Sequence, residues 1–215
     1  MDVGFLAWAG EARFCRAVRL HGIEHIAPTR AAGRRVILLA PHCVGMNVGG
    51  IAVARAHAVF SMVKPQRDPL VNWVLNKARS RYGSPLIGRG QGLRPVVRAL
   101  EAGQIFYYLP DEDLGPRHSV FAPFFGVPTA TLDMLGRLAR LTHAAVVPCF
   151  TRLTPAGYDV YLLPPLADYP TGDAVRDATT MNLAIEAEIR AVPEQYMWTF
   201  KLFKTRPDGA RSPYE

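Results

Sequence analysis

Hydrophobic residues gather in five short runs that are bounded by glycine or proline and rich in β-branched and aromatic side chains. Several runs are apolar at consecutive positions rather than alternate ones, which is typical of strands covered on both faces of a sheet. The pattern predicts strands over residues 35–41, 57–63, 104–110, 144–152 and 158–164.

Between these runs the apolar positions recur with the helical period of about 3.6 residues. They predict helices over residues 45–56, 68–82, 92–102, 129–142 and 174–191. Strands that alternate with helices favour an α/β fold, in which a mainly parallel sheet is sandwiched by helices. Because the sequence contains no internal repeat and no convincing linker, we expect a single domain over residues 1–215.

Composition narrows the classes of function. The net charge of +7 and the pI of about 9.6 predict a polyanionic neighbour, which is nucleic acid, an anionic membrane, an acidic protein or a phosphorylated substrate. The absence of RNA-recognition, zinc-finger and helix-turn-helix motifs argues against nucleic acid. The sequence has no apolar run long enough for a membrane-spanning helix, and its three widely spaced cysteines indicate neither a disulfide framework nor a zinc site.

The stretch "ILLAPHCVGMNVGG" (37–50) runs from a predicted strand into His42. Ligands in such folds bind beyond the carboxyl ends of the strands, so His42 lies where a site is expected. It could act as a general base toward a hydroxyl if an acceptor held its Nδ1–H. The alternative is a histidine that only caps the turn between strand and helix. We interpret Cys43, which follows it, as a small packed side chain rather than a nucleophile.

A second polar group, "YLPDEDLGPRHSVFAPFFG" (108–126), follows another predicted strand. Acids and bases beside an apolar tail suit a site that meets both a polar headgroup and an acyl chain; alternatively, this is a charged loop whose tail packs in the core. A series of basic residues could receive phosphate or carboxylate groups, or simply form a solvated helix face. The series comprises Lys64, Arg67, Lys77, Arg79, Arg81, Arg89 and Arg94.

Together, these stretches resemble the bacterial late acyltransferases of lipid A biosynthesis, the lauroyl and myristoyl transferases. The most specific pieces are "YYLPDEDLGPRHSVFAPFFGVPTAT", "VVPCF" and "PEQYMWTFKLFKTRP", and the match extends from about residue 20 to the end. The resemblance implies the glycerolipid acyltransferase fold. It also implies transfer of an acyl chain from acyl carrier protein to a hydroxyl of a lipid A precursor, without a metal or organic cofactor.

The family's catalytic motif is a histidine followed five residues later by Asp or Glu. His42 matches the histidine, but the fifth residue is Asn47. If Asn47 faces His42 Nδ1, its amide oxygen can accept a hydrogen bond from Nδ1–H but cannot stabilise the imidazolium with a charge. The corresponding change in a serine protease triad lowers kcat about 10⁴-fold. Another acid, such as Asp111 or Asp113, could take over this role.

The resemblance also implies the cytoplasmic face of the inner membrane, although the family's apolar amino-terminal anchor has no counterpart in this sequence. A truncated gene product, a trimmed form and a peripheral form are all open explanations. The stretch "FLAWAGEARFCRAVRL" (5–20) places Arg13, Arg16 and Arg19 at three-residue spacing and predicts either an interfacial helix or a plain surface helix. We therefore expect peripheral contact with an anionic membrane surface.

These expectations combine into one leading hypothesis and one alternative. The leading hypothesis is an acyltransferase dependent on acyl carrier protein, in which His42 acts as the base and Asn47 as its partner. The alternative is a catalytically impaired, lipid-binding relative, because Asn47 replaces the usual carboxylate. The residues assigned to substrate binding are Arg79, Arg81, Asp111, Asp113 and Arg117. The "PEQYMWTFKLFKTRPDG" stretch (193–209) is interpreted as either an interfacial segment or a closing helix.

Overall fold

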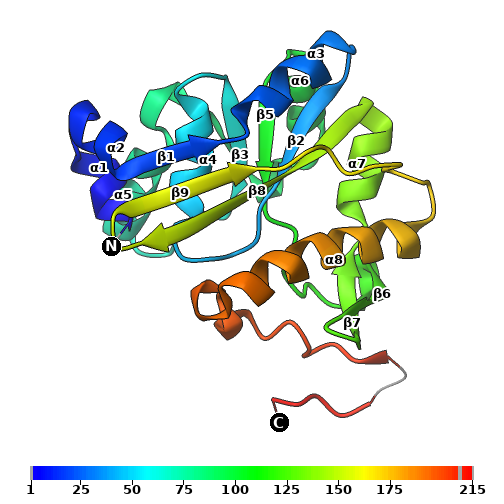
Figure 1. Ribbon diagram of the computed structural model, residues 1–215. Helices are drawn as coiled ribbons and strands as arrows, with labels where there is room; N and C mark the ends of the chain where they lie inside the picture. Colours follow the sequence, from blue (N-terminus) through cyan, green and yellow to red (C-terminus); the bar gives the residue numbers. More distant parts are fainter. Residues whose placement is uncertain (1, 208–209, 215) are drawn as a thin grey trace.

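The computed structural model describes residues 2–207 and 210–214, and within them a seven-stranded sheet forms the centre of the fold (Figure 1). Neighbouring strands are parallel except for β8 and β9, so β1 and β9 run against the other five. In spatial order the strands are β1 (Val18–His21), β9 (Gly157–Leu162), β8 (Ala144–Thr154), β2 (Arg35–Leu39), β5 (Ile105–Tyr108), β3 (Val59–Val63) and β4 (Leu86–Gly88). The expected mainly parallel sheet is confirmed.

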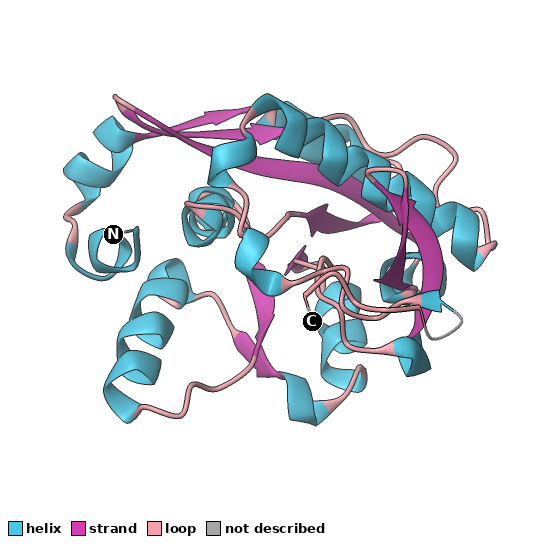
Figure 2. Ribbon diagram, turned by 90° about the horizontal axis from the view of Figure 1, so that it is seen from below, coloured by secondary structure: helices cyan, strands magenta, loops and turns pink. Residues whose placement is uncertain are grey.

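Helices cover both faces of this sheet (Figure 2). Successive side chains of β2 point to opposite faces, so Leu38 joins one hydrophobic core and Leu39 joins the other. The first core packs against α1 (Asp2–Trp8), α2 (Glu11–Ala17), α3 (Ile26–Ala31) and α4 (Met46–Ala54). The second packs against α6 (Arg94–Glu101), α7 (Met134–Thr142) and α8 (Ala174–Ala191). This arrangement explains the continuous apolar runs in the sequence, because both faces of the central strands are buried.

The five predicted strands correspond to β2, β3, β5, β8 and β9, and the prediction for α8 matches its observed bounds. The helix predicted from residue 129 is wrong over its first turn, because residues 127–132 form β7 (Val127–Leu132). This strand makes an antiparallel hairpin with β6 (Ser119–Phe124) that packs against α8. The apolar tail of the acidic loop is therefore a hairpin, which the aromatic run did not reveal.

The amino-terminal stretch is not the single helix expected for residues 5–20. It breaks after α1, resumes as α2 and ends in β1, where Arg19 pairs with Asp159 at 2.6 Å. Arg19 therefore does not lie on a helix face with Arg13 and Arg16. The extended backbone of β1 is stabilised by pairing with β9, which local periodicity cannot show.

Two further segments complete the chain. Helix α5 (Pro69–Arg79) begins at Asp68, whose side chain accepts a hydrogen bond from the Val71 amide, and it lies beside α1 at one end of the molecule (Figure 1). After α8, the chain runs through two short 3₁₀ turns, η5 (Pro193–Gln195) and η6 (Trp198–Phe200), toward the carboxyl terminus. Within the described residues, no helix is both long enough and apolar enough to cross a membrane.

Candidate functional site

The geometry of the sheet brings His42 to the acidic loop. Strands β2 and β5 are parallel neighbours, with Leu39 paired with Tyr108, so the loops after them leave the same edge of the sheet. The Ala40 amide continues the pairing by donating to the Tyr108 carbonyl at 3.0 Å. The next residues of each loop, His42 on one and Asp111 on the other, therefore face each other.

Asp111 fixes both the ring and the backbone of His42. One carboxylate oxygen lies 2.7 Å from His42 Nδ1, and the other accepts the His42 amide at 2.8 Å. Both residues are buried. Because a carboxylate can only accept, the proton between them sits on Nδ1, and the lone pair of the neutral ring lies on Nε2. This is the arrangement that a histidine general base requires.

Asn47 does not contact His42 Nδ1, so the expected pairing of these residues is corrected by the structure. Its Oδ1 accepts a hydrogen bond from Arg79 Nε at 2.9 Å, and its Nδ2 donates to Asp2 at 3.3 Å. Asn47 lies in the first turn of α4, and Asp111 already occupies the space beside Nδ1. The carboxylate missing from the family motif is thus supplied by another loop.

The carboxyl-terminal segment closes over the histidine. The Tyr196 hydroxyl donates to Asp111 at 3.0 Å, and the Phe200 ring lies 4.4 Å from the His42 ring, centroid to centroid. The Met197 amide donates to the His42 carbonyl at 3.0 Å. Burial and the adjacent Asp111 charge raise the pKa of Tyr196 far above its usual range, so the phenol remains a donor.

A second carboxylate lies on the other side of the ring. Glu112 Oε1 is 3.5 Å from His42 Nε2, and Glu112 Oε2 pairs with Arg89 at 2.7 Å. The sequence offered partial clues to these residues, because Glu112 belongs to the acidic loop and Arg89 to the basic series. Nothing in the local pattern pointed to Tyr196 and Phe200, since their contacts with His42 and Asp111 are long-range.

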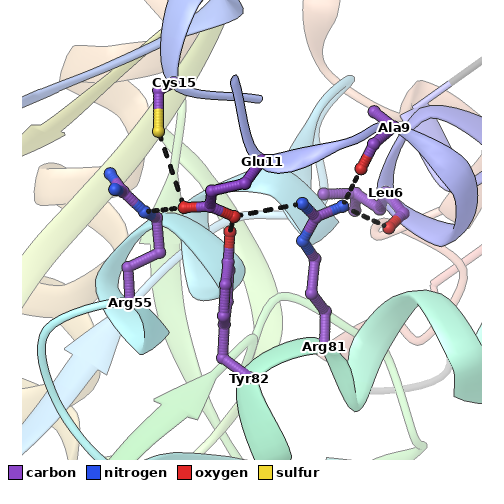
Figure 3. A network of polar contacts seen from close by, with 7 residues as sticks. All are labelled: Leu6, Ala9, Glu11, Cys15, Arg55, Arg81 and Tyr82. Carbon is purple, nitrogen blue, oxygen red and sulfur yellow. Dashed lines mark hydrogen bonds and ion pairs between the residues drawn. The ribbon is translucent and has the colours of Figure 1, made fainter. Parts of the chain in front are cut away.

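The structure separates the other residues assigned to substrate binding. Arg79 lines the same cavity as His42, and burial lowers the pKa of its guanidinium. Arg81 instead donates to the carbonyls of Leu6 and Ala9 and pairs with Glu11, tying the amino-terminal helices to the chain after α5 (Figure 3). It is not part of the cavity wall.

Asp113 and Arg117 also lie apart from the histidine. Asp113 is buried and accepts hydrogen bonds from the Thr205 amide and hydroxyl at 2.7 and 2.8 Å. Its contacts therefore anchor the carboxyl-terminal segment. Arg117 is exposed and does not line the cavity, whereas its neighbour His118 does.

Cys43 is a packed side chain, as the sequence indicated. It is buried, and its thiol donates weakly to the Thr151 carbonyl. Burial, together with the Asp111 charge, raises its pKa to about 12, so the thiolate needed for nucleophilic attack is scarce near neutral pH. Among the described residues, no cluster of three or more His, Cys, Asp or Glu side chains is arranged to hold a metal ion.

A cavity of about 610 Å³ lies beside His42. Its polar lining includes His42, Asn47, Arg79, Arg89, Glu112 and His118, with Lys64 and Gln66 from the segment before α5. Most of the remaining wall is apolar and includes Met46, Ile51, Val59, Phe60, Met62, Phe106 and Leu138. An apolar cavity with a few polar groups beside a positioned histidine can bind a lipid chain next to a base.

Comparison with solved structures confirms the fold class. The 1-acyl-sn-glycerophosphate acyltransferase of Thermotoga maritima superposes with a TM-score of 0.50 over 90% of this chain and 80% of that chain, at 17% sequence identity. Its fold is the glycerolipid acyltransferase fold expected from the sequence. At this identity the likeness concerns the fold alone.

Comparison of sequences identifies the family. The chain matches the family model described as bacterial lipid A biosynthesis acyltransferase over residues 1–205. A lipid A biosynthesis acyltransferase of Haemophilus influenzae is 35% identical over 96% of this chain and 65% of the relative. The lauroyltransferase of Escherichia coli is 34% identical over 100% of this chain and 71% of the relative, and its myristoyltransferase 34% identical over 98% and 66%. The chain spans about two thirds of the length of these relatives, and it belongs to the family of bacterial lipid A biosynthesis acyltransferases.

Proposed function

We propose that the protein transfers a fatty acyl chain from acyl carrier protein to a hydroxyl group of a lipid A precursor, with His42 as the general base. The observation that carries this proposal is the placement of His42. Asp111 holds its Nδ1 at 2.7 Å, beside an apolar cavity of about 610 Å³. The family of the chain supports the reaction class and the acceptor.

The proposed chemistry follows from the orientation of the ring. His42 Nε2 takes the proton of the acceptor hydroxyl as its oxygen attacks the thioester carbonyl. The imidazolium that forms is stabilised by the Asp111 carboxylate. When the tetrahedral intermediate collapses, the carbon–sulfur bond breaks and Nε2 returns the proton to the leaving thiolate. The products are the new ester and the free carrier thiol.

Arg79 is our candidate for stabilising the oxyanion. Its guanidinium lines the cavity and is held by Asn47 through Nε at 2.9 Å. A fixed donor that faces developing charge is effective because it needs no reorganisation during the reaction. We do not assign this role to Arg81, whose donors face the backbone of α1 and the segment that follows it. Arg117 is left for an acceptor headgroup outside the cavity.

The proposed partners fit the charge of the chain. A protein with a net charge of +7 attracts both an acidic carrier protein and an anionic membrane. We propose peripheral association with the cytoplasmic face of the inner membrane, where such an acceptor is reached. A lipid-binding protein without transferase activity is the alternative. The presence of Asn47 is a weaker argument for this alternative, because Asp111 places a carboxylate beside His42.

The test is a transfer assay with radiolabelled acyl groups on acyl carrier protein and a lipid A precursor. Wild-type protein should form the acylated product, and His42→Ala should reduce turnover about 10³-fold or more, because a positioned base contributes about 10²–10⁴-fold and also orients the acceptor. His57→Ala, the same substitution outside the cavity wall, is the matched control. Lipid binding without transfer by the wild type would favour the non-catalytic alternative.

A further inference from the structure

The two nitrogens of His42 face two carboxylates at different distances. Asp111 lies 2.7 Å from Nδ1, which is a short hydrogen bond, whereas Glu112 Oε1 lies 3.5 Å from Nε2. A separation of 3.5 Å exceeds the usual range of an N–H···O hydrogen bond. Glu112 is therefore close enough to act through its charge and too far to bind the ring nitrogen.

Arg89 accounts for this offset. Its Nη1 lies 2.7 Å from Glu112 Oε2, so the guanidinium draws the carboxylate away from the ring. Arg89 belongs to η3 (Arg89–Gln91), directly after the edge strand β4, whereas Glu112 follows β5. The pKa of Arg89 is raised chiefly by its hydrogen bond with Glu112, which is consistent with a direct pair. The side chain of Glu112 is 15% exposed and that of Arg89 is 38% exposed, so water reaches the pair mainly from the arginine side.

The distance matters because Nε2 must offer a lone pair to the acceptor hydroxyl. If Glu112 moved about 0.7 Å closer, it would accept an Nε2–H and stabilise the ring with protons on both nitrogens. Such a ring cannot act as a base. At its present position, Glu112 still stabilises by its charge the imidazolium formed during proton transfer.

We propose that Arg89 is a positioning residue that holds Glu112 away from His42 Nε2 and so keeps the base available to substrate. The inference rests on the proposed function, because that function makes Nε2 the reacting atom. The contacts among Arg89, Glu112 and His42 are present in the protein without substrate. The positioning role can therefore be tested both with and without substrate.

The kinetic test is a double-mutant cycle between Arg89 and Glu112. Arg89→Met keeps an unbranched side chain in place of the aliphatic part of arginine and removes the guanidinium with its charge. It should lower kcat about tenfold or more in the wild-type background, with a smaller change in KM. In an E112Q background the same substitution should change kcat by less than about threefold, because a neutral amide does not hold the extra proton.

The pH profile is a second readout. Within the described part of the chain, the charged groups beside the His42 ring are Asp111 and Glu112 after β5. Tyr196 of the carboxyl-terminal segment acts on the ring through Asp111, and Arg89 acts through Glu112. Arg89→Met should move the acidic limb of the kcat profile to higher pH, since a carboxylate on Nε2 favours the protonated ring. The shift should vanish in the E112Q background. Arg94→Met, an exposed arginine outside the cavity wall, should leave both rate and profile unchanged.

Two kinetic results would overturn the inference. Equal losses of kcat from Arg89→Met in both backgrounds would mean that Arg89 acts on substrate or on folding, not through Glu112. Unchanged kcat in the wild-type background would mean that Glu112 needs no restraint.

Nitrogen NMR of histidine-labelled protein without substrate separates this inference from the proposed function. The sequence has six histidines, and His42→Ala identifies the resonances of interest. We expect a protonated Nδ1 and a free Nε2 in the wild type at mildly alkaline pH, and protonation of Nε2 persisting to higher pH in Arg89→Met. If this result appears while the wild type transfers no acyl group, the proposed reaction fails and the positioning role stands. Identical spectra in the two proteins would overturn it.

Discussion

At the residue scale, the carboxylate that contacts His42 belongs to Asp111, which lies 69 positions further along the chain, and not to the helix that follows His42. Asp111 can take the place of the family's carboxylate because it lies on the loop after β5, whereas residue 47 lies on α4. Asn47 is left in contact with Arg79, a cation, where an uncharged amide accepts a hydrogen bond without adding a negative charge beside the guanidinium. Asn47, whose presence in place of Asp or Glu indicated an impaired enzyme, is therefore compatible with a complete histidine–carboxylate pair.

Asp111→Asn should show the value of that pair. The amide keeps the shape but removes the charge that stabilises the imidazolium, and it can donate to Nδ1 and favour the wrong tautomer. We expect kcat to fall about 10³–10⁴-fold in the transfer assay, as in the corresponding change of a serine protease triad. A protein that folds normally and loses less than about threefold would contradict the assignment of Asp111.

Asn47→Asp is the complementary substitution. If Asn47 were the missing partner of His42, a carboxylate there would raise turnover about 10²–10⁴-fold. The structure leads to the opposite expectation, because the new carboxylate would pair with Arg79 and approach Asp2. We expect no gain in kcat and no change in the acidic limb of the pH profile. A large gain would show that the side chain of residue 47 reaches His42 during catalysis.

At the element scale, the segment after α8 completes the site. It crosses the loop after β2, contributes Tyr196 and Phe200 to the surroundings of His42, and is anchored further along by Asp113. This aromatic and basic segment therefore forms a cover over His42, the base that we propose. The buried Asp113 carboxylate, which also accepts the Gly115 amide at 2.9 Å, links this cover to the acidic loop.

Asp113→Ala should loosen the cover. The substitution leaves the Thr205 amide and hydroxyl without their acceptor. A hydrogen bond to a charged group contributes about 1.5–3 kcal/mol to stability. We expect the free energy of unfolding to fall by about 1–3 kcal/mol, with faster amide exchange over residues 193–205. Thermal denaturation and hydrogen exchange measure these effects. Glu194→Gln, an exposed change in the same segment, is the control, and equal behaviour of the two variants would contradict the anchoring role.

At the scale of the whole molecule, the net charge of +7 combines with an exposed aromatic end. Trp8 on α1 and Trp73 on α5 are 58% and 53% exposed, and the Lys77 ammonium lies 4.9 and 5.1 Å from their ring centroids. Leu70, also on α5, is exposed as well. Indole rings with an apolar body and a polar edge, together with lysine, suit the interface of an anionic bilayer.

Vesicle co-sedimentation should detect this association. We expect binding to anionic vesicles that weakens as salt increases, because charge attraction is screened beyond about 8 Å at physiological ionic strength. Trp73→Ala should weaken it further, whereas Leu141→Ala, an exposed apolar change on α7, should not. Equal binding to neutral vesicles at low and high salt would refute the electrostatic part. Equal binding by the two variants would refute the assignment of the α1/α5 end.

Local sequence determined the central framework of this protein. The continuous apolar runs predicted β2, β3, β5, β8 and β9, and the helical period of residues 174–191 predicted α8, because such patterns record which side chains a strand or helix must bury. The position of His42 after a buried strand also predicted the location of the candidate site, since the carboxyl ends of parallel strands share one edge.

Tertiary structure decided what the site contains. The short strands β1 and β4 and the β6–β7 hairpin depend on pairing with other strands or packing on α8, which three to six residues of local pattern cannot specify. The same holds for chemistry. Asp111 rather than Asn47 meets His42, and Tyr196 covers it, because hydrogen-bond partners are chosen by distance in space and not by spacing in the chain. The sequence provides the polar groups, and the folded backbone determines which of them touch.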